Sequence, residues 1–134
     1  ERAATMNPYA ALAAAGVALA LGSDAPVTPL DPWGTVRAAV QHRTPGSGLS
    51  ARAAFSAHTR GGWRAARIDG TGELTPGAPA TFAIWELPDE LVVQVPDSRV
   101  SAWSTDPRAA VAGLPDLGAP DPVCRATVVQ GVTL

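Results

Sequence analysis

A short apolar run ends in a glycine, a serine and an aspartate, and this stretch constrains the fold more than any other. Leucine, alanine and valine alternate over Val17–Leu21, and Gly22-Ser23-Asp24 follows directly. The pattern is typical of a buried strand that carries a carboxylate at its C-terminal tip. In parallel α/β folds, the side chains that do chemistry gather at such tips. We therefore predict a strand over residues 17–24, with Asp24 at a functional edge.

The length of the chain bounds the architecture. Its 134 residues are enough for one ordinary domain, whereas a complete α/β barrel needs about 250 residues. The hydrophobic content of 46% and the charged content of 16% are typical of a folded domain. The sequence starts at Glu1 without a methionine and stops at Leu134, part-way through a hairpin pattern. We therefore expect a C-terminal piece of a longer polypeptide.

Charge and cysteine usage argue against several classes of function. The net charge of −2 disfavours nucleic acid or an acidic membrane surface as a partner. No apolar run reaches the roughly 20 residues that span a bilayer, and no signal peptide is visible. The chain contains no lysine, so it offers no carbamylated lysine to bridge metals. Its single cysteine, Cys124, cannot form an internal disulfide and suits a reducing compartment. We therefore predict a cytoplasmic location.

Capping residues mark the helices of the first half. Asn7-Pro8 and Asp31-Pro32 each place a capping side chain before a proline at the first helical position. Ser50 is a third candidate cap. We predict helices over Tyr9–Ala15, Trp33–Gln41, Ala51–His58 and Gly62–Arg67.

Glycine and proline punctuate the second half, which is typical of short strands joined by turns. We predict strands over Thr81–Trp85, Leu91–Val95 and Val123–Val129, and a brief helix from Asp106-Pro107 to Ala112. The change of character places a boundary between residues 1–68 and 69–134. Helices and a strand followed by a β-rich unit favour an α/β fold class.

Five segments together resemble the C-terminal third of metal-dependent amidohydrolases, in the amidohydrolase family 3 branch that includes N-substituted formamide deformylases. The order and spacing of these segments carry the resemblance, whereas the Gly-x-Leu-x-Pro-Gly turn alone is common. One departure is Ala80-Thr81, where the family usually has Ala-Asp before the strand. The segments are Ala15–Val27, Asp31–Arg43, Leu49–Thr59, Gly72–Trp85 and Thr127–Gly131.

The resemblance implies an architecture and an activity. Residues 1–68 would be the end of a (β/α)8 barrel, with its last strand over 17–24, and residues 69–134 part of a small β-sandwich. Asp24 would bind a catalytic divalent metal, zinc by expectation, and pass a proton from the metal-bound water to the leaving group. The parent enzyme would hydrolyse a C–N bond in a small amide or N-acyl substrate.

The family's metal-binding histidines lie on earlier strands that this sequence does not include. We therefore expect the chain alone to be inactive and to bind no metal, since a metal site needs about three protein ligands. A lone barrel strand would also expose open edges, so we expect self-association. The alternative is a non-catalytic packing or interaction module, in which Asp24 only forms an Asx-turn or caps a helix.

Other polar and aromatic residues have more ordinary interpretations. His42 and His58 lack a His-x-His or i, i+4 partner, so we predict a place at helix ends or exposure to solvent instead of metal binding. Arg43 is predicted to satisfy terminal carbonyls of a helix, with substrate contact as the alternative. The four tryptophans are predicted to be packing residues, although Trp33 follows the Asp24 loop closely enough to touch a substrate. Cys124 is predicted to be a small core residue.

Overall fold

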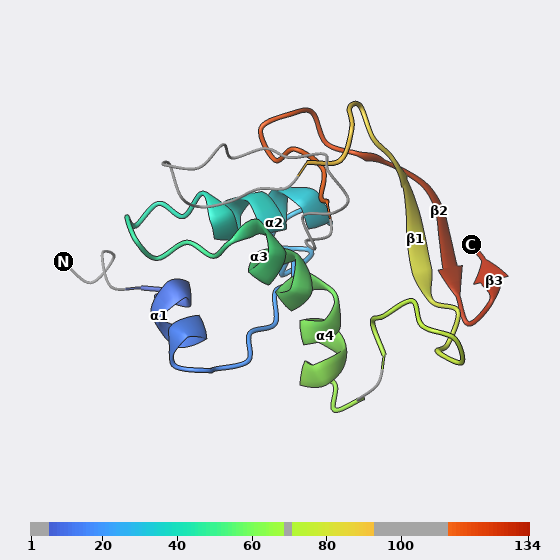
Figure 1. Cartoon of the computed structure of the whole chain (residues 1–134), viewed down its shortest axis with the longest axis horizontal. Helices are drawn as coiled ribbons and strands as arrows, with labels where there is room; N and C mark the ends of the chain where they lie inside the picture. The colour runs from blue at the N-terminus through green and yellow to red at the C-terminus, as the bar shows by residue number, and fades with distance from the viewer. Residues whose placement is uncertain (1–5, 69–70, 93–112) are drawn as a thin grey trace.

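Four helices precede a three-stranded antiparallel sheet in the computed structural model, which describes residues 6–68, 71–92 and 113–134. Figure 1 shows the helices on one side and the sheet, in yellow and red, on the other. This mixture of helices and strands fits the α/β class. The elements are α1 (Tyr9–Ala14), α2 (Pro32–Val40), α3 (Ala51–His58), α4 (Arg60–Ala65), β1 (Phe82–Glu86), β2 (Val123–Val129) and β3 (Val132–Thr133).

Helix α2 begins where its cap predicts. The side chain of Asp31 accepts a hydrogen bond of 2.8 Å from the backbone N–H of Gly34, and Pro32 occupies the first helical position. The helix buries Trp33, Val36 and Ala39, which recur every three residues and so share one face.

Helix α3 has the predicted bounds, and α2 packs against it. The hydroxyl of Ser50 accepts a hydrogen bond of 3.2 Å from the backbone N–H of Ala53. The buried residues Ala51, Ala54 and Ala57 form a stripe of small side chains, which lets the two helices approach closely. Short α4 follows with Thr59 at its N-cap, and begins two residues before its predicted start.

The sheet confirms the predicted strand over Val123–Val129. Strand β1 pairs with β2 in antiparallel register, and the pairing shifts by one residue between Ile84 and Trp85. Gln130 and Gly131 then turn the chain into β3 with positive φ angles of 50° and 82°. Both values are those of a two-residue hairpin turn whose twist matches the strands.

The third predicted strand is only partly described. Val92 forms an isolated antiparallel bridge with Leu114, and no named strand includes it. The rest of the Leu91–Val95 prediction, and the helix predicted from Asp106, lie outside the described residues.

The predicted strand over residues 17–24 does not form in the described part of the chain, where this segment makes no ladder with any described strand, and its pairing within a barrel stays a prediction. Its backbone bonds to helices instead: the N–H of Val17 donates to the carbonyl of Leu12 at 3.0 Å, and that of Leu21 to Ala57 at 3.1 Å. A strand exists only beside a hydrogen-bonded neighbour. An alternating apolar pattern indicates a preference for such a neighbour and does not supply one.

The core sits between α2, α3 and β1. The ring of Trp33 stacks on Phe55 with centroids 5.9 Å apart and meets Trp85 edge-on at 5.6 Å. Trp33 is buried, and Trp85 packs against the same cluster. The predicted packing role is therefore confirmed for these two tryptophans.

Arg37 ties the C-terminal segment to the helices. Its Nε donates a hydrogen bond of 2.8 Å to the carbonyl of Leu117, and its guanidinium also pairs with Asp121. Leu117 is buried in the core cluster. Cys124, by contrast, is exposed on β2, so its predicted place in the core is wrong. Within the described ranges, no helix is long and apolar enough to cross a membrane.

Candidate functional site

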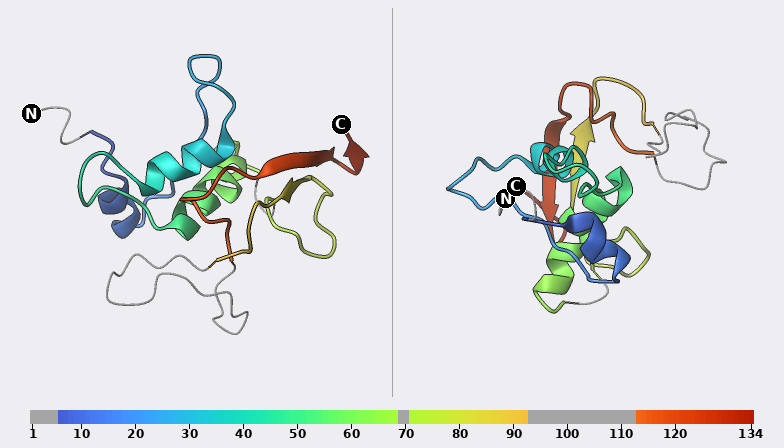
Figure 2. Two further views of the ribbon diagram at one scale, coloured as in Figure 1. Left: turned by 90° about the horizontal axis from the view of Figure 1, so that it is seen from above. Right: turned by 90° about the vertical axis from the view of Figure 1, so that its left-hand side faces the viewer.

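Asp24 lies in a loop that protrudes from the helices. Figure 2 shows this loop, in light blue between α1 and α2, standing clear of the rest of the chain. The backbone of Asp24 has a φ of 57°, and its carbonyl accepts a hydrogen bond of 2.9 Å from the N–H of Val27. The hydroxyl of Thr28 donates to the carbonyl of Ser23, which closes the loop on itself. The left-handed conformation is one that Asp tolerates better than most residues.

The carboxylate of Asp24 is exposed and makes no hydrogen bond or ion pair with any residue that the structure describes. It does not cap the following helix, because Asp31 fills that position. The turn at Asp24 is closed by its backbone and not by its side chain. The carboxylate is therefore free to act on something outside the described chain.

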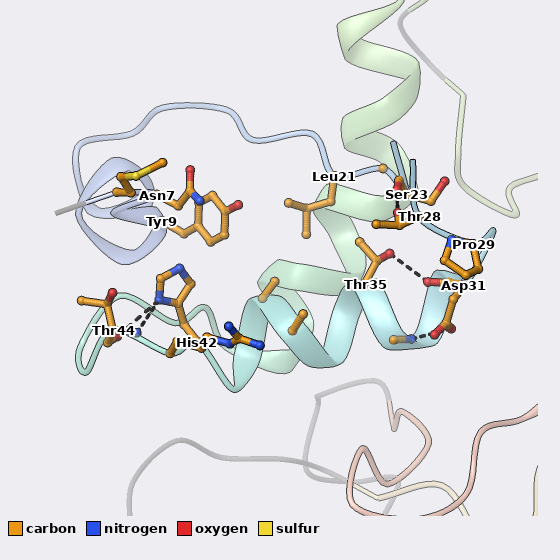
Figure 3. Close-up of a pocket in the computed structure, with 16 residues that line it drawn as sticks. Asn7, Tyr9, Leu21, Ser23, Thr28, Pro29, Asp31, Thr35, His42 and Thr44 are labelled. Atoms are coloured by element: carbon orange, nitrogen blue, oxygen red, sulfur yellow. Dashed lines mark hydrogen bonds between the residues drawn. The ribbon is translucent and has the colours of Figure 1, made fainter. Parts of the chain in front are cut away.

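A groove of ≈ 620 Å³ runs beside this loop. Figure 3 shows its walls, which come from α1, from the two ends of the Asp24 loop, and from α2 with the turn after it. Gly22 and Ser23 line it on one side of Asp24, and Thr28 and Pro29 on the other. Asp24 itself does not line the groove but lies within the loop that borders it.

The far end of the groove carries an aromatic residue and a histidine. Tyr9 and His42 meet edge to face, with ring centroids 5.3 Å apart and an interplanar angle of 81°. Nδ1 of His42 accepts a hydrogen bond of 3.0 Å from the backbone N–H of Thr44. In the neutral imidazole the proton therefore sits on Nε2, which makes that atom a donor.

The other predicted polar residues are divided between two places. Arg43 lines the groove and, among the described residues, has no ion-pair partner, which leaves its guanidinium open to an anionic group. His58 ends α3, as predicted, but lines a different pocket, and so does Trp33. The structure thus gives no support for contact between Trp33 and a substrate in this groove.

No three His, Cys, Asp or Glu side chains within the described ranges come close enough to hold a metal ion. The described residues therefore do not by themselves form a metal centre. Tyr9 was not singled out from the sequence, because its place in the groove depends on how α1 packs beside the turn after α2.

A family model described as "Amidohydrolase family" matches residues 1–134. No curated protein and no solved structure matches the chain.

Proposed function

The chain belongs to the amidohydrolase family, and from this premise we propose that it supplies Asp24 to the active site of a metal-dependent hydrolase. The exposed, unpaired carboxylate beside a groove is the observation that carries the proposal. Asp24 accepts a proton from the attacking water and returns it to the nitrogen that leaves. A carboxylate positioned beside the reacting water can do both steps, because its oxygens can accept a proton and give it back.

The metal of the proposed reaction needs ligands beyond the described residues. The described residues bring no three His, Cys, Asp or Glu side chains together, whereas a catalytic site uses about three protein ligands. When bound, a divalent ion such as zinc supplies a water whose pKa is lowered toward about 7. We assign Asp24 one coordination position in such a site and leave the others to residues outside the described ranges.

The remaining finer features of the proposal rest on the resemblance of the sequence. Residues 1–68 would close a (β/α)8 barrel and residues 69–134 would belong to a β-sandwich. In that setting the segment over 17–24 would pair with neighbouring barrel strands. The substrate would be a small amide or N-acyl compound, as in the formamide deformylase-like branch, and the C–N bond would be cleaved.

Replacement of Asp24 tests the proposal directly. In an active enzyme that contains this chain, Asp24→Asn should lower kcat for an N-formyl or N-acetyl amine by about a hundredfold or more, because the general base is lost. Asp89→Asn is the matched control, because Asp89 is also exposed but does not line the groove. Circular dichroism should show both variants folded. Near-normal turnover by Asp24→Asn would refute the assignment.

A second candidate is a non-catalytic packing module, and the exposed apolar side chains favour it. Val27 and Leu30 in the Asp24 loop are 79% and 83% exposed, which suits a surface that another chain covers. Both the packing-module proposal and the hydrolase proposal imply that the chain alone hydrolyses nothing and binds zinc no better than a surface aspartate does. Zinc titration by calorimetry, with Asp24→Ala as comparison, measures that affinity.

We further propose a cytoplasmic location. The thiol of Cys124 is exposed and is not part of a disulfide. An exposed free thiol persists in a reducing compartment and is oxidised outside one. Mass spectrometry of the protein from its native cells should therefore show Cys124 as a free thiol.

A further inference from the structure

A second pocket lies on the opposite side of α2 from the Asp24 groove. It has a volume of ≈ 430 Å³ and is bounded by α2, by the junction of α3 and α4, and by β1 with the loop before it. The two cavities share no lining residue: Thr35 and Ala38 of α2 line the groove, whereas Trp33 and Val36 line the pocket.

Aromatic rings dominate the wall of this second pocket. None of the described residues that line it is Asp, Glu, Arg or Lys. Such a wall suits a planar molecule without a net charge, because rings stack on rings and no described lining residue carries a permanent charge. The aromatic lining residues are Trp33, Phe55, Trp63, Phe82 and Trp85.

Two of the lining residues each have an enclosed ring nitrogen with no hydrogen-bond partner among the described residues: Nε1 of Trp33 and Nε2 of His58. Trp33 is only 7% exposed. The indole N–H can only donate, so what it lacks is an acceptor atom. Buried donors are nearly always paired, and an unpaired one costs about 1–3 kcal/mol.

We propose that this pocket binds a small uncharged aromatic molecule bearing a carbonyl oxygen, which accepts a hydrogen bond from Nε1 of Trp33. The rings of the wall hold the ligand by stacking, and the oxygen supplies the missing acceptor. Because Nε1 is enclosed, the indole must turn slightly toward the ligand, and pairing of the buried donor favours that motion. The site is separate from the proposed Asp24 site and does not depend on it.

Benzamide and toluene are the probes that separate the two parts of the proposal. Both carry one phenyl ring, but only benzamide has an acceptor oxygen. Titration into the full chain, followed by tryptophan fluorescence and calorimetry, should show saturable binding of benzamide that is about fivefold tighter than that of toluene. Absence of saturable benzamide binding overturns the proposal and leaves water as the occupant. Equal affinity for the two probes overturns the assigned hydrogen bond.

Three variants locate the binding. Trp33→Phe keeps an aromatic ring and removes the N–H, so it should abolish the preference for benzamide. Ala83→Leu fills the pocket from β1 and should weaken both probes about tenfold, whereas Ala38→Leu, which faces the other groove, should weaken neither. Loss of benzamide binding in Ala38→Leu alone would overturn the location. If Trp33→Phe fails to fold, two other results still decide the outcome. These are the relative affinities of the two probes for the unsubstituted chain, and the effects of Ala83→Leu and Ala38→Leu.

Discussion

Two adjacent glycines of α4 differ in what surrounds them. A Cβ added to Gly61 would overlap the carbonyl oxygen of Leu19 and lie 3.2 Å from the Cα of Ala20. A Cβ added to Gly62 would meet nothing within 4 Å. The segment before the Asp24 loop thus passes against α4 only because residue 61 has no side chain.

Replacing glycine by alanine should therefore have opposite effects on stability at these two positions. Gly62→Ala should raise the free energy of unfolding by about 0.5–1 kcal/mol, because alanine favours the helix. Gly61→Ala should lower it by about 1–3 kcal/mol, because backbone on both sides must move. Urea denaturation followed by circular dichroism measures both. If Gly61→Ala were as stable as Gly62→Ala, the segment around Leu19 would not lie against α4.

At the scale of single residues, the sequence predicts hydrogen bonds to near neighbours in the chain better than it predicts which side chains are buried. The caps Asp31 and Ser50 were predictable because a cap bonds to a backbone N–H only three residues away. The exposure of Cys124 and the enclosure of Nε2 of His58 were not predictable, because each depends on residues far away in the chain. The free carboxylate of Asp24 follows from its loop, while its catalytic role stays a prediction.

The cap of α3 gives a prediction at the scale of the element. Ser50→Ala removes the acceptor for the N–H of Ala53 and should cost about 1 kcal/mol of stability. Ser56→Ala, inside the same helix, should change stability by less than about 0.5 kcal/mol, because no cap bond is lost. Thermal unfolding of the two variants compares them. Equal losses would mean that α3 does not depend on its cap.

Whole elements were predictable where their signals are local. The bounds of α3 and β2 agree with the predictions, since a cap starts the helix and a tight turn ends the strand. The segment over 17–24 depends on distant partners instead: its pattern fits a strand, but no described strand lies beside it to pair with. The Asp24 groove was not predictable for the same reason: its walls come from α1 and from the turn after α2, which are apart in the sequence.

At the scale of the whole molecule, one cluster joins the helices to the sheet. Trp33 of α2 contacts Trp85 of β1, and Arg37 of α2 holds the carbonyl of Leu117. Residues far apart in sequence meet here, so no local pattern could predict the cluster or the aromatic pocket beside it. The sheet, beyond these contacts, leaves many apolar side chains exposed, among them Ile84, Val123 and Val132.

The outer edge of β2 predicts self-association. Strand β3 pairs with β2 only at Val128 and Val129, so the edge over residues 123–126 has no strand partner in the described part of the chain. Val123 on this edge is 53% exposed. Unpaired edges with apolar side chains recruit further strands, so a second copy should pair here. Light scattering under reducing conditions should give a mass above the 13.6 kDa of one chain.

A charge on that edge should prevent the pairing. Val123→Lys should shift the scattering mass toward a single chain, because a lysine on an edge strand opposes pairing with a second strand. Leu74→Lys is the matched control: its side chain is 80% exposed but lies outside the strands, so the associated species should persist. If both variants dissociate alike, exposed apolar surface in general drives the association. A monomeric unsubstituted chain would contradict the prediction altogether, and the unpaired edge would then be tolerated by the isolated chain.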